Sequence, residues 1–316
     1  MKIVFEIRGG IGKSVAATAV CKAIKTQYPS SKLIVITGYP PVFEGNRNVF
    51  EVRMGHEGAY FYRDHIMDQE DTIFFLQEPY IETDFIHRRG HLIKVWCEMN
   101  GIKYNGEMPE IFLNYKEKSS FGALFRFPKP IFLIQTNGGM PNKTDKYSWP
   151  RDMPFATAQK VVDAFLPTHT VIHIRRNDQP TLKGAIPIEA SFRHLAVLIA
   201  MSDLRLFIDS FAQHTAAGLG MPSVVFWVAN VPSQFGYELH DNIIANPPTL
   251  EPELRYAGLS KYNTNGPEKE FPYNDEEEII EAEVLIAALK KYTKTVTPPQ
   301  KHKPPQKQNK KHRKNN

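Results

Sequence analysis

Residues 209–222 read Asp-Ser-Phe-Ala-Gln-His-Thr-Ala-Ala-Gly-Leu-Gly-Met-Pro and directly follow an apolar run, Leu204–Ile208. The run is typical of a buried strand, and Asp209 or Ser210 is expected to cap a helix that begins next. Small residues let this helix pack closely, and the Gly-Met-Pro sequence turns the chain into a further strand. The N-terminus of such a helix faces the carboxyl edge of a parallel sheet, where α/β proteins bind ligands.

The same alternation of strands and helices runs through both halves of the chain, and it predicts an α/β fold. The expected strands are 2–7, 32–36, one near 49–53, 131–134, 170–174, 204–208 and 223–228. The expected helices are about 13–27, 91–99, 154–166, 190–201, 212–219 and a last one that opens on Asp275 and runs to about Tyr292. We therefore predict two Rossmann-like domains, residues 1–127 and 128–293, joined by a linker near Pro128 and Pro130.

The composition is that of a globular protein, with 42% hydrophobic and 23% charged residues in a chain of 316. Only Cys21 and Cys97 are present, so no disulfide framework or cysteine-rich metal site is available. No apolar run approaches the roughly 18 residues of a membrane span, and the N-terminus does not resemble a signal peptide. These features predict a cytoplasmic protein.

The net charge of +5 is unevenly distributed. Residues 294–316 carry eight of the 39 Lys and Arg and no acid, which leaves 31 basic against 34 acidic residues elsewhere, a net charge of −3. The prolines of residues 294–316 and their scarcity of apolar residues predict that this segment is a disordered basic tail. The tail is either a solubilising appendage or a weak contact for nucleic acid or another polyanion.

The segment Arg8-Gly9-Gly10-Ile11-Gly12-Lys13-Ser14 follows an apolar strand and raises the question of a phosphate-binding loop. Such a loop needs a glycine five positions before Gly12, where this chain has Ile7. The variant loop of ParA-like ATPases starts with lysine, which here is Arg8, and no acid follows the next strand to hold magnesium. The alternative is a tight strand-to-helix turn in which Gly9, Gly10 and Gly12 let the backbone approach a ligand.

The stretch 209–222 resembles the donor-site signature of family nine glycosyltransferases, the lipopolysaccharide heptosyltransferase type. The matching residues are Asp209, Ser210, His214, Ala216, Ala217, Leu219, Gly220 and Pro222. Residues 9–20 are similar to the opening Gly-x-Gly-Asp loop and helix of that family. Gln135–Gly139, followed by Lys146 and Trp149-Pro150, looks like its phosphate-binding loop with one extra residue. The resemblance covers most of the chain and implies a GT-B fold, two Rossmann-like domains facing a cleft, with a C-terminal helix that crosses back.

The resemblance also implies the activity: an inverting glycosyltransferase that takes its sugar from a nucleotide-diphosphate donor and needs no metal or cofactor. The absence of an Asp-x-Asp triplet agrees with this. The residues expected to bind the donor are Thr136, Asn137, Gly138, Lys146, Asp209, Ser210 and His214. The implied acceptor is a saccharide of the lipopolysaccharide type, and a nucleic-acid base bound through the basic tail is the alternative.

The catalytic base is where this chain departs from the family. The family carries an acid after the last loop glycine, and this chain has Lys13 there, either as a base with a depressed pKa or as a cation beside the donor phosphates. Asp64 and His65 are candidate replacements by residue type. Phe211 stands where the family has glycine and is expected to crowd the donor. A ParA-like ATPase and a non-catalytic nucleotide-sugar binding protein therefore remain alternatives.

Overall fold

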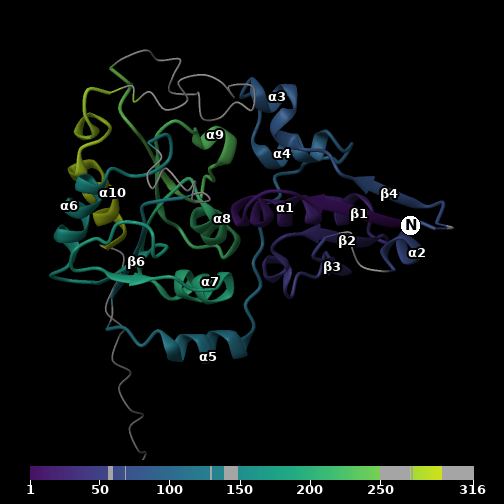
Figure 1. Cartoon of the computed structure of the whole chain (residues 1–316), viewed down its shortest axis with the longest axis horizontal. Coiled ribbons are helices and arrows are strands. Elements are labelled where there is room, and N and C mark those ends of the chain that lie inside the picture. The colour runs from purple at the N-terminus through teal and green to yellow at the C-terminus, as the bar shows by residue number, and fades with distance from the viewer. Residues whose placement is uncertain are drawn as a thin grey trace, which may run out of the picture.

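The chain folds into two parallel β-sheets covered by helices, and each sheet forms the centre of one domain (Figure 1). The computed structural model describes residues 1–55, 60–67, 69–128, 130–138, 149–249, 271 and 273–293. The α/β fold class expected from the sequence is confirmed. None of the described helices is long and apolar enough to span a bilayer.

The first sheet has the strand order β3-β2-β1-β4, all parallel. Its strands are β1 (Lys2–Ile7), β2 (Lys32–Thr37), β3 (Glu51–Arg53) and β4 (Thr72–Phe75). The accompanying helices are α1 (Ile11–Gln27), α2 (Phe61–His65), α3 (Thr83–Ile86), α4 (Leu92–Glu98) and the 3-10 turns η1 (Pro40–Phe43) and η2 (Pro79–Ile81). The buried residues of the central strand β1 are all apolar, as expected for a strand covered on both faces of the sheet, and those of α1 are apolar apart from Lys13, Ser14 and Thr18.

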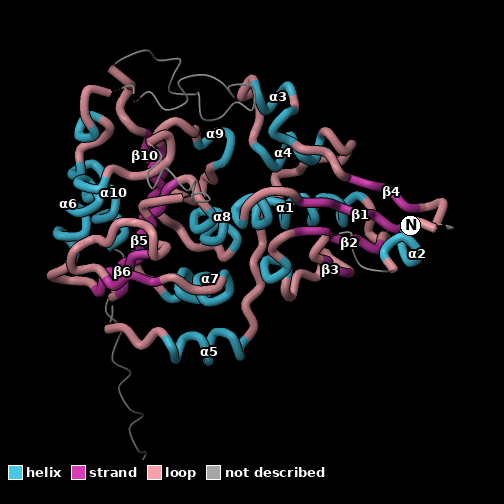
Figure 2. Tube along the Cα trace, in the orientation of Figure 1, coloured by secondary structure: helices cyan, strands magenta, loops and turns pink. Residues whose placement is uncertain are grey.

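The second sheet has the order β10-β9-β8-β5-β6-β7, again all parallel (Figure 2). Its strands are β5 (Ile131–Gln135), β6 (Thr170–Ile174), β7 (Ile186–Ile188), β8 (Leu204–Ile208), β9 (Val224–Trp227) and β10 (Asp241–Ile244). Its helices are α5 (Tyr115–Leu124), α6 (Phe155–Phe165), α7 (Phe192–Met201), α8 (Phe211–Gly218), α9 (Pro232–Phe235) and α10 (Ala282–Thr293), with the 3-10 turn η4 (Glu276–Glu278).

The last helix differs from the expectation in two ways. Asp275 does act as a cap, but it accepts hydrogen bonds from the backbone N–H groups of Glu277 and Glu278 in the separate turn η4, and α10 begins only at Ala282. The helix buries Leu285 and Leu289 in the core of the second domain, against α6, β8 and β9. It therefore packs on the second domain and does not cross back to the first (Figure 1). The predicted tail, 294–316, lies outside the described residues.

The two domains are in direct contact through α1 and α8, which lie side by side (Figure 1). A single hydrophobic cluster extends from Val15 and Val20 of α1 to Ala217 of α8 and Trp227 of β9. The linker helix α5 packs on α7, and the backbone N–H of Ile111 donates to the carbonyl oxygen of Gly218 at 2.9 Å. The carboxyl ends of the two sheets consequently face one another across a close-packed interface.

Candidate functional site

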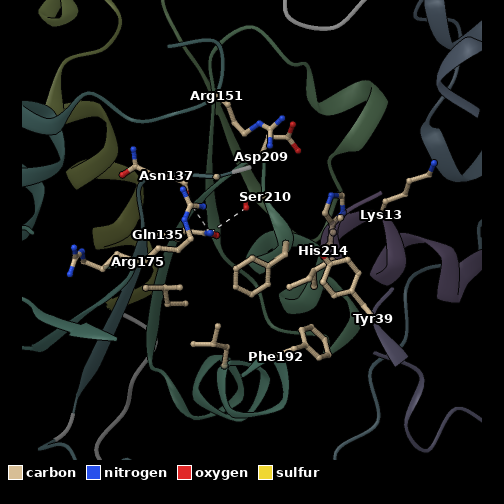
Figure 3. A pocket seen from close by; sticks show the side chains of 18 of the residues that line it. Lys13, Tyr39, Gln135, Asn137, Arg151, Arg175, Phe192, Asp209, Ser210 and His214 are labelled. Carbon is tan, nitrogen blue, oxygen red and sulfur yellow. Dashed lines mark hydrogen bonds between the residues drawn. The ribbon is translucent and has the colours of Figure 1, made fainter. Parts of the chain in front are cut away.

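A cavity of about 710 Å³ lies where the carboxyl ends of the two sheets meet. The first domain contributes the loop Gly10–Lys13 and Tyr80, and the second contributes Asn137, Gly138 and Asp209–Phe211 (Figure 3). This volume falls within the range of small-molecule sites. The structure thus brings the two glycine-containing loops singled out from the sequence to one site.

The N-termini of α1 and α8 meet at this cavity. Gly9 has φ +106° and turns the chain into α1, a conformation that L side chains rarely adopt. A Cβ atom on Gly12 would lie 3.0 Å from His214 Cδ2 and 3.4 Å from Phe211 Cα. Gly12 therefore permits the close approach of α8, and it also lines the cavity, where the sequence had suggested the approach of a ligand.

The hydroxyl of Ser210 does not cap α8, contrary to the expectation. Ser210 occupies the cap position, but no side-chain cap hydrogen bond is formed. Its Oγ atom accepts a hydrogen bond from Gln135 Nε2 at 3.2 Å (Figure 3), and the alternative cap Asp209 is engaged by Asn230 Nδ2. The N-terminus of α1 is likewise without a side-chain cap. Two helix N-termini without side-chain caps at one cavity favour an anionic ligand.

The loop after β5 is held in shape by a buried carboxylate. Asp152 accepts hydrogen bonds from Asn137 Nδ2 at 3.0 Å and from the backbone N–H of Gly138 at 2.9 Å. Thr136 Oγ1 is buried, 2.8 Å from Asn137 Oδ1 and 2.9 Å from His173 Nε2. Asn137 and Gly138 line the cavity, and Thr136 supports them from behind. Lys146 lies outside the described residues.

Asp209 is buried at the cavity wall, with the guanidinium of Arg151 beside it (Figure 3). Burial raises the pKa of the Asp209 carboxyl, and the positive charge of Arg151 and the hydrogen bond from Asn230 oppose that rise. Arg151 is half-buried and makes no hydrogen bond to a described residue. It is therefore a cation that can turn towards an anionic ligand in the cavity.

His214 lines the cavity but also belongs to a buried polar cluster. Its Nδ1 atom lies 2.7 Å from the hydroxyl oxygen of Tyr237. Burial lowers the pKa of His214 to about 3, and the charges of His91, His240 and Arg151 lower it further. The ring is consequently neutral near pH 7 and can donate or accept a hydrogen bond without carrying charge.

Lys13 is buried between the domains, with its ammonium held by the first domain. Its Nζ atom donates to Glu78 Oε1 at 2.5 Å and lies 4.7 Å from the ring centroid of Tyr80 and 5.0 Å from that of Trp96. A lysine of a nucleotide-binding phosphate loop would instead reach over the loop towards bound phosphate. The side chain points away from His214 and the donor side of the cavity (Figure 3).

Asp64 and His65 lie at the opposite edge of the first sheet. The carbonyl oxygen of Asp64 accepts from Lys2 Nζ at 2.6 Å, and that of His65 accepts from the Thr72 hydroxyl, so α2 sits beside the amino ends of β1 and β4. The six residues of β1 separate this edge from the cavity by roughly 17 Å. The structure does not bring these two residues together with the other candidates.

Sequence reasoning missed several residues that line the cavity. Arg175 and Arg176 directly follow β6, and Arg151 follows the Trp-Pro pair of the donor loop. Two arginines immediately after a buried parallel strand are a signal that could have been used, because ligands bind at the carboxyl ends of such strands. Within the described ranges, no three His, Cys, Asp or Glu side chains are grouped to hold a metal ion.

No family model matches the chain, and no curated protein matches it in sequence. Solved structures do resemble it over most of its length. One is a family 9 glycosyl transferase from Veillonella parvula, 13% identical with a TM-score of 0.63, covering 92% of this chain and 96% of that one. Another is the E. coli ADP-heptose LPS heptosyltransferase II, 12% identical with a TM-score of 0.66, covering 92% and 98%. A third is TibC, an iron-containing dodecameric glycosyltransferase from enterotoxigenic E. coli, 11% identical with a TM-score of 0.67, covering 94% and 77%. The chain therefore shares the two-domain fold of these glycosyltransferases.

Proposed function

We propose that the protein is a glycosyltransferase that moves a sugar from a nucleoside-diphosphate sugar to an acceptor hydroxyl with inversion at the anomeric carbon. One observation carries the proposal: the N-terminus of α8, without a side-chain cap, faces an interdomain cavity that also holds Asn137, Gly138 and Arg151. Backbone N–H groups and a guanidinium fixed in advance would stabilise the charge that grows on the diphosphate as the glycosidic bond breaks.

In this proposal the second domain binds the donor. Asn137, Gly138 and Ser210 contact the diphosphate together with Lys146, and Thr136 orients Asn137 for that contact. Arg151 supplies positive charge where other transferases use a metal ion, so binding is expected to persist in EDTA. Sugars linked to adenosine diphosphate are the first donors to try, because the E. coli heptosyltransferase of the same fold is described as acting with ADP-heptose.

The sequence leaves two other functions open. A ParA-like ATPase needs Lys13 at the nucleotide, and its ion pair with Glu78 weighs against that role. A non-catalytic sugar-nucleotide binding protein would use the same cavity and differs only in lacking turnover. The described residues add nothing in favour of a nucleic-acid acceptor, and the saccharide acceptor stays the proposal.

The test is calorimetric binding of ADP, GDP, UDP and their sugar conjugates, with EDTA or with magnesium, beside ATP with magnesium. We expect metal-independent binding of one diphosphate class, weakened at least tenfold by Arg151→Ala. The matched control is Arg89→Ala, which removes an arginine from an exposed ion pair with Asp84 in the first domain. Magnesium-dependent ATP binding that survives Arg151→Ala and is lost in Lys13→Ala would refute the transferase and support the ATPase.

A further inference from the structure

The ion pair between Lys13 and Glu78 joins two segments that are 65 residues apart in the sequence. Lys13 is in the first turn of α1, and Glu78 follows β4 by three residues. The strands β1 and β4 are parallel neighbours, with Phe5 paired to Phe75. Their carboxyl ends therefore place an ammonium and a carboxylate side by side at the edge of the sheet that faces the cavity.

Glu78 is held in one orientation, because one of its two carboxylate oxygens accepts hydrogen bonds. Oε1 accepts from Lys13 Nζ at 2.5 Å and from the backbone N–H of Tyr80 at 3.5 Å. Oε2 accepts no hydrogen bond from any residue in the part of the chain that the structure describes. The Glu78 side chain is 20% exposed and that of Lys13 4%. The lysine is thus an internal anchor, and the free carboxylate oxygen keeps access to solvent.

Tyr80 connects this carboxylate to the cavity, because its backbone N–H donates to Glu78 Oε1 and its side chain belongs to the cavity wall. The phenol lines the cavity, and burial raises its pKa well above the ordinary value. The carboxylates of Asp209 and Glu78 raise that pKa further. Tyr80 therefore lies between a carboxylate of the first domain and one of the second. The carboxylate of Glu6 raises the pKa of Arg8, in the loop after β1, and the charge of Glu78 adds to that rise.

We infer that Glu78 is the general base of the sugar transfer and that Lys13 is its positioning residue, an inference that rests on the proposed function. The acceptor oxygen forms a bond to the anomeric carbon while the bond from that carbon to the diphosphate oxygen breaks. The electron pair of the broken bond leaves with the nucleoside diphosphate. The proton of the acceptor hydroxyl passes to Glu78 Oε2, so atoms and charge balance without a further reactant.

This assignment explains the lysine at the position of the family carboxylate. A carboxylate there would lie against Glu78, and two like charges in contact disfavour ionisation of both. With the acid supplied from β4, a lysine on α1 pairs with it and orients it. Asp209 is a weaker candidate for the base, because it is bound by Asn230 and faces Arg151 on the donor side.

The experiment compares wild type with Glu78→Gln, Glu78→Asp and the control Glu82→Gln, four residues further along the same segment. Donor affinity is measured by calorimetry, and turnover is measured as nucleoside diphosphate released from the best-binding donor, with water as acceptor. We expect Glu78→Gln to bind donor within twofold of wild type and to lose at least 100-fold in rate. Glu78→Asp should retain turnover at a reduced rate, and Glu82→Gln should match wild type.

A purely structural ion pair predicts a different result. Glu78→Gln would then turn over within threefold of wild type, or would lose donor affinity and turnover together, and either result overturns the base assignment. Wild type that binds donor without releasing diphosphate contradicts the proposed sugar transfer itself, because that is the result expected of a non-catalytic binding protein. Failure of every diphosphate sugar to bind wild type contradicts the proposed function itself, which keeps the two failures distinguishable.

Discussion

Gly12 of α1 and His214 of α8 touch across the two domains, since a Cβ atom on Gly12 would approach His214 Cδ2 to 3.0 Å. This contact brings the two glycine-containing segments of the sequence into one site. The packing depends on a missing side chain at one residue and on a buried, neutral ring at the other. Adding a single methyl group at Gly12 should therefore disturb the packing between the two domains.

Gly12→Ala should destabilise the protein by about 1–3 kcal/mol, because overpacking a close contact forces neighbouring atoms to move. Urea unfolding measures the change, and Gly10→Ala is the matched control, since nothing lies within 4 Å of a Cβ at that position. In the His214→Ala background, Gly12→Ala should cost less, with a coupling of about 1 kcal/mol. Strictly additive effects would show that the two residues do not press on one another.

Arg193 of α7 connects the linker to both domains. Its guanidinium donates to Glu117 Oε1 at 2.6 Å and Oε2 at 2.7 Å, and to the carbonyl oxygen of Phe112 at 2.6 Å. The arginine holds the pKa of the Glu117 carboxyl below its usual range. It also reaches the carbonyl oxygen of Pro41 in the first domain at 3.3 Å.

Arg193→Ala should cost about 3 kcal/mol in the free energy of unfolding, because it leaves a poorly solvated carboxylate and carbonyls without their donor. Arg89→Ala removes an exposed arginine from its pair with Asp84 and should cost less than about 1 kcal/mol. Urea unfolding of both variants checks the difference. Equal effects would mean that Arg193 contributes no more than a surface charge does.

The buried elements were predictable because their signal is local. The continuous apolar runs of β1, β6 and β8 were predicted with their observed bounds. The edge strands β4, β7 and β10 were missed: they are only three or four residues long, and β7 carries Pro187, which argues against a strand. Their pairing is decided by neighbouring strands and not by their own sequence.

The site was predictable only where one segment carried all the information. The cavity-lining residues Asn137, Gly138 and Ser210 belong to short motifs whose order is visible in the sequence. The partnership of Lys13 with Glu78 depends on strand order, which brings β4 beside β1 and cannot be read from either segment alone. The proposed replacement bases Asp64 and His65 were chosen by residue type, and such a choice carries no information about which edge of the sheet they occupy.

Thr136 allows a direct separation of structural support from ligand contact. Thr136→Val keeps the shape but leaves His173 Nε2 and Asn137 Oδ1 without their partner, so it should cost about 1–3 kcal/mol. Thr168→Val is matched to it, since Thr168 makes a similar contact with His169 Nδ1 at 2.8 Å on the surface, and should change stability by less than about 0.5 kcal/mol. Thermal unfolding compares the two. A stable Thr136→Val protein with much weaker donor binding would instead make Thr136 a ligand contact.

Four histidines whose pKa is strongly lowered should make the protein sensitive to mild acid. Burial is the first cause in each case, and it lowers the pKa of His214 to about 3 and those of His91, His173 and His240 to about 4. The unfolded chain takes up protons near pH 6.5, whereas the folded chain does not until about pH 4. Between these values the unfolded state binds more protons, so the free energy of unfolding falls as the pH falls.

The free energy of unfolding can change by about 1.4 kcal/mol per pH unit for each histidine that stays neutral in the folded state. Urea unfolding at pH 7.5, 6.5 and 5.5 measures it above the range in which carboxylates titrate. His240→Gln keeps a donor for the carbonyl oxygen of Gln213, which His240 Nε2 approaches to 3.0 Å, and removes one titrating ring. This variant should lose less stability between pH 6.5 and 5.5 than wild type does. A free energy of unfolding that is constant across this range in wild type would mean that water or a proton reaches these rings in the folded protein.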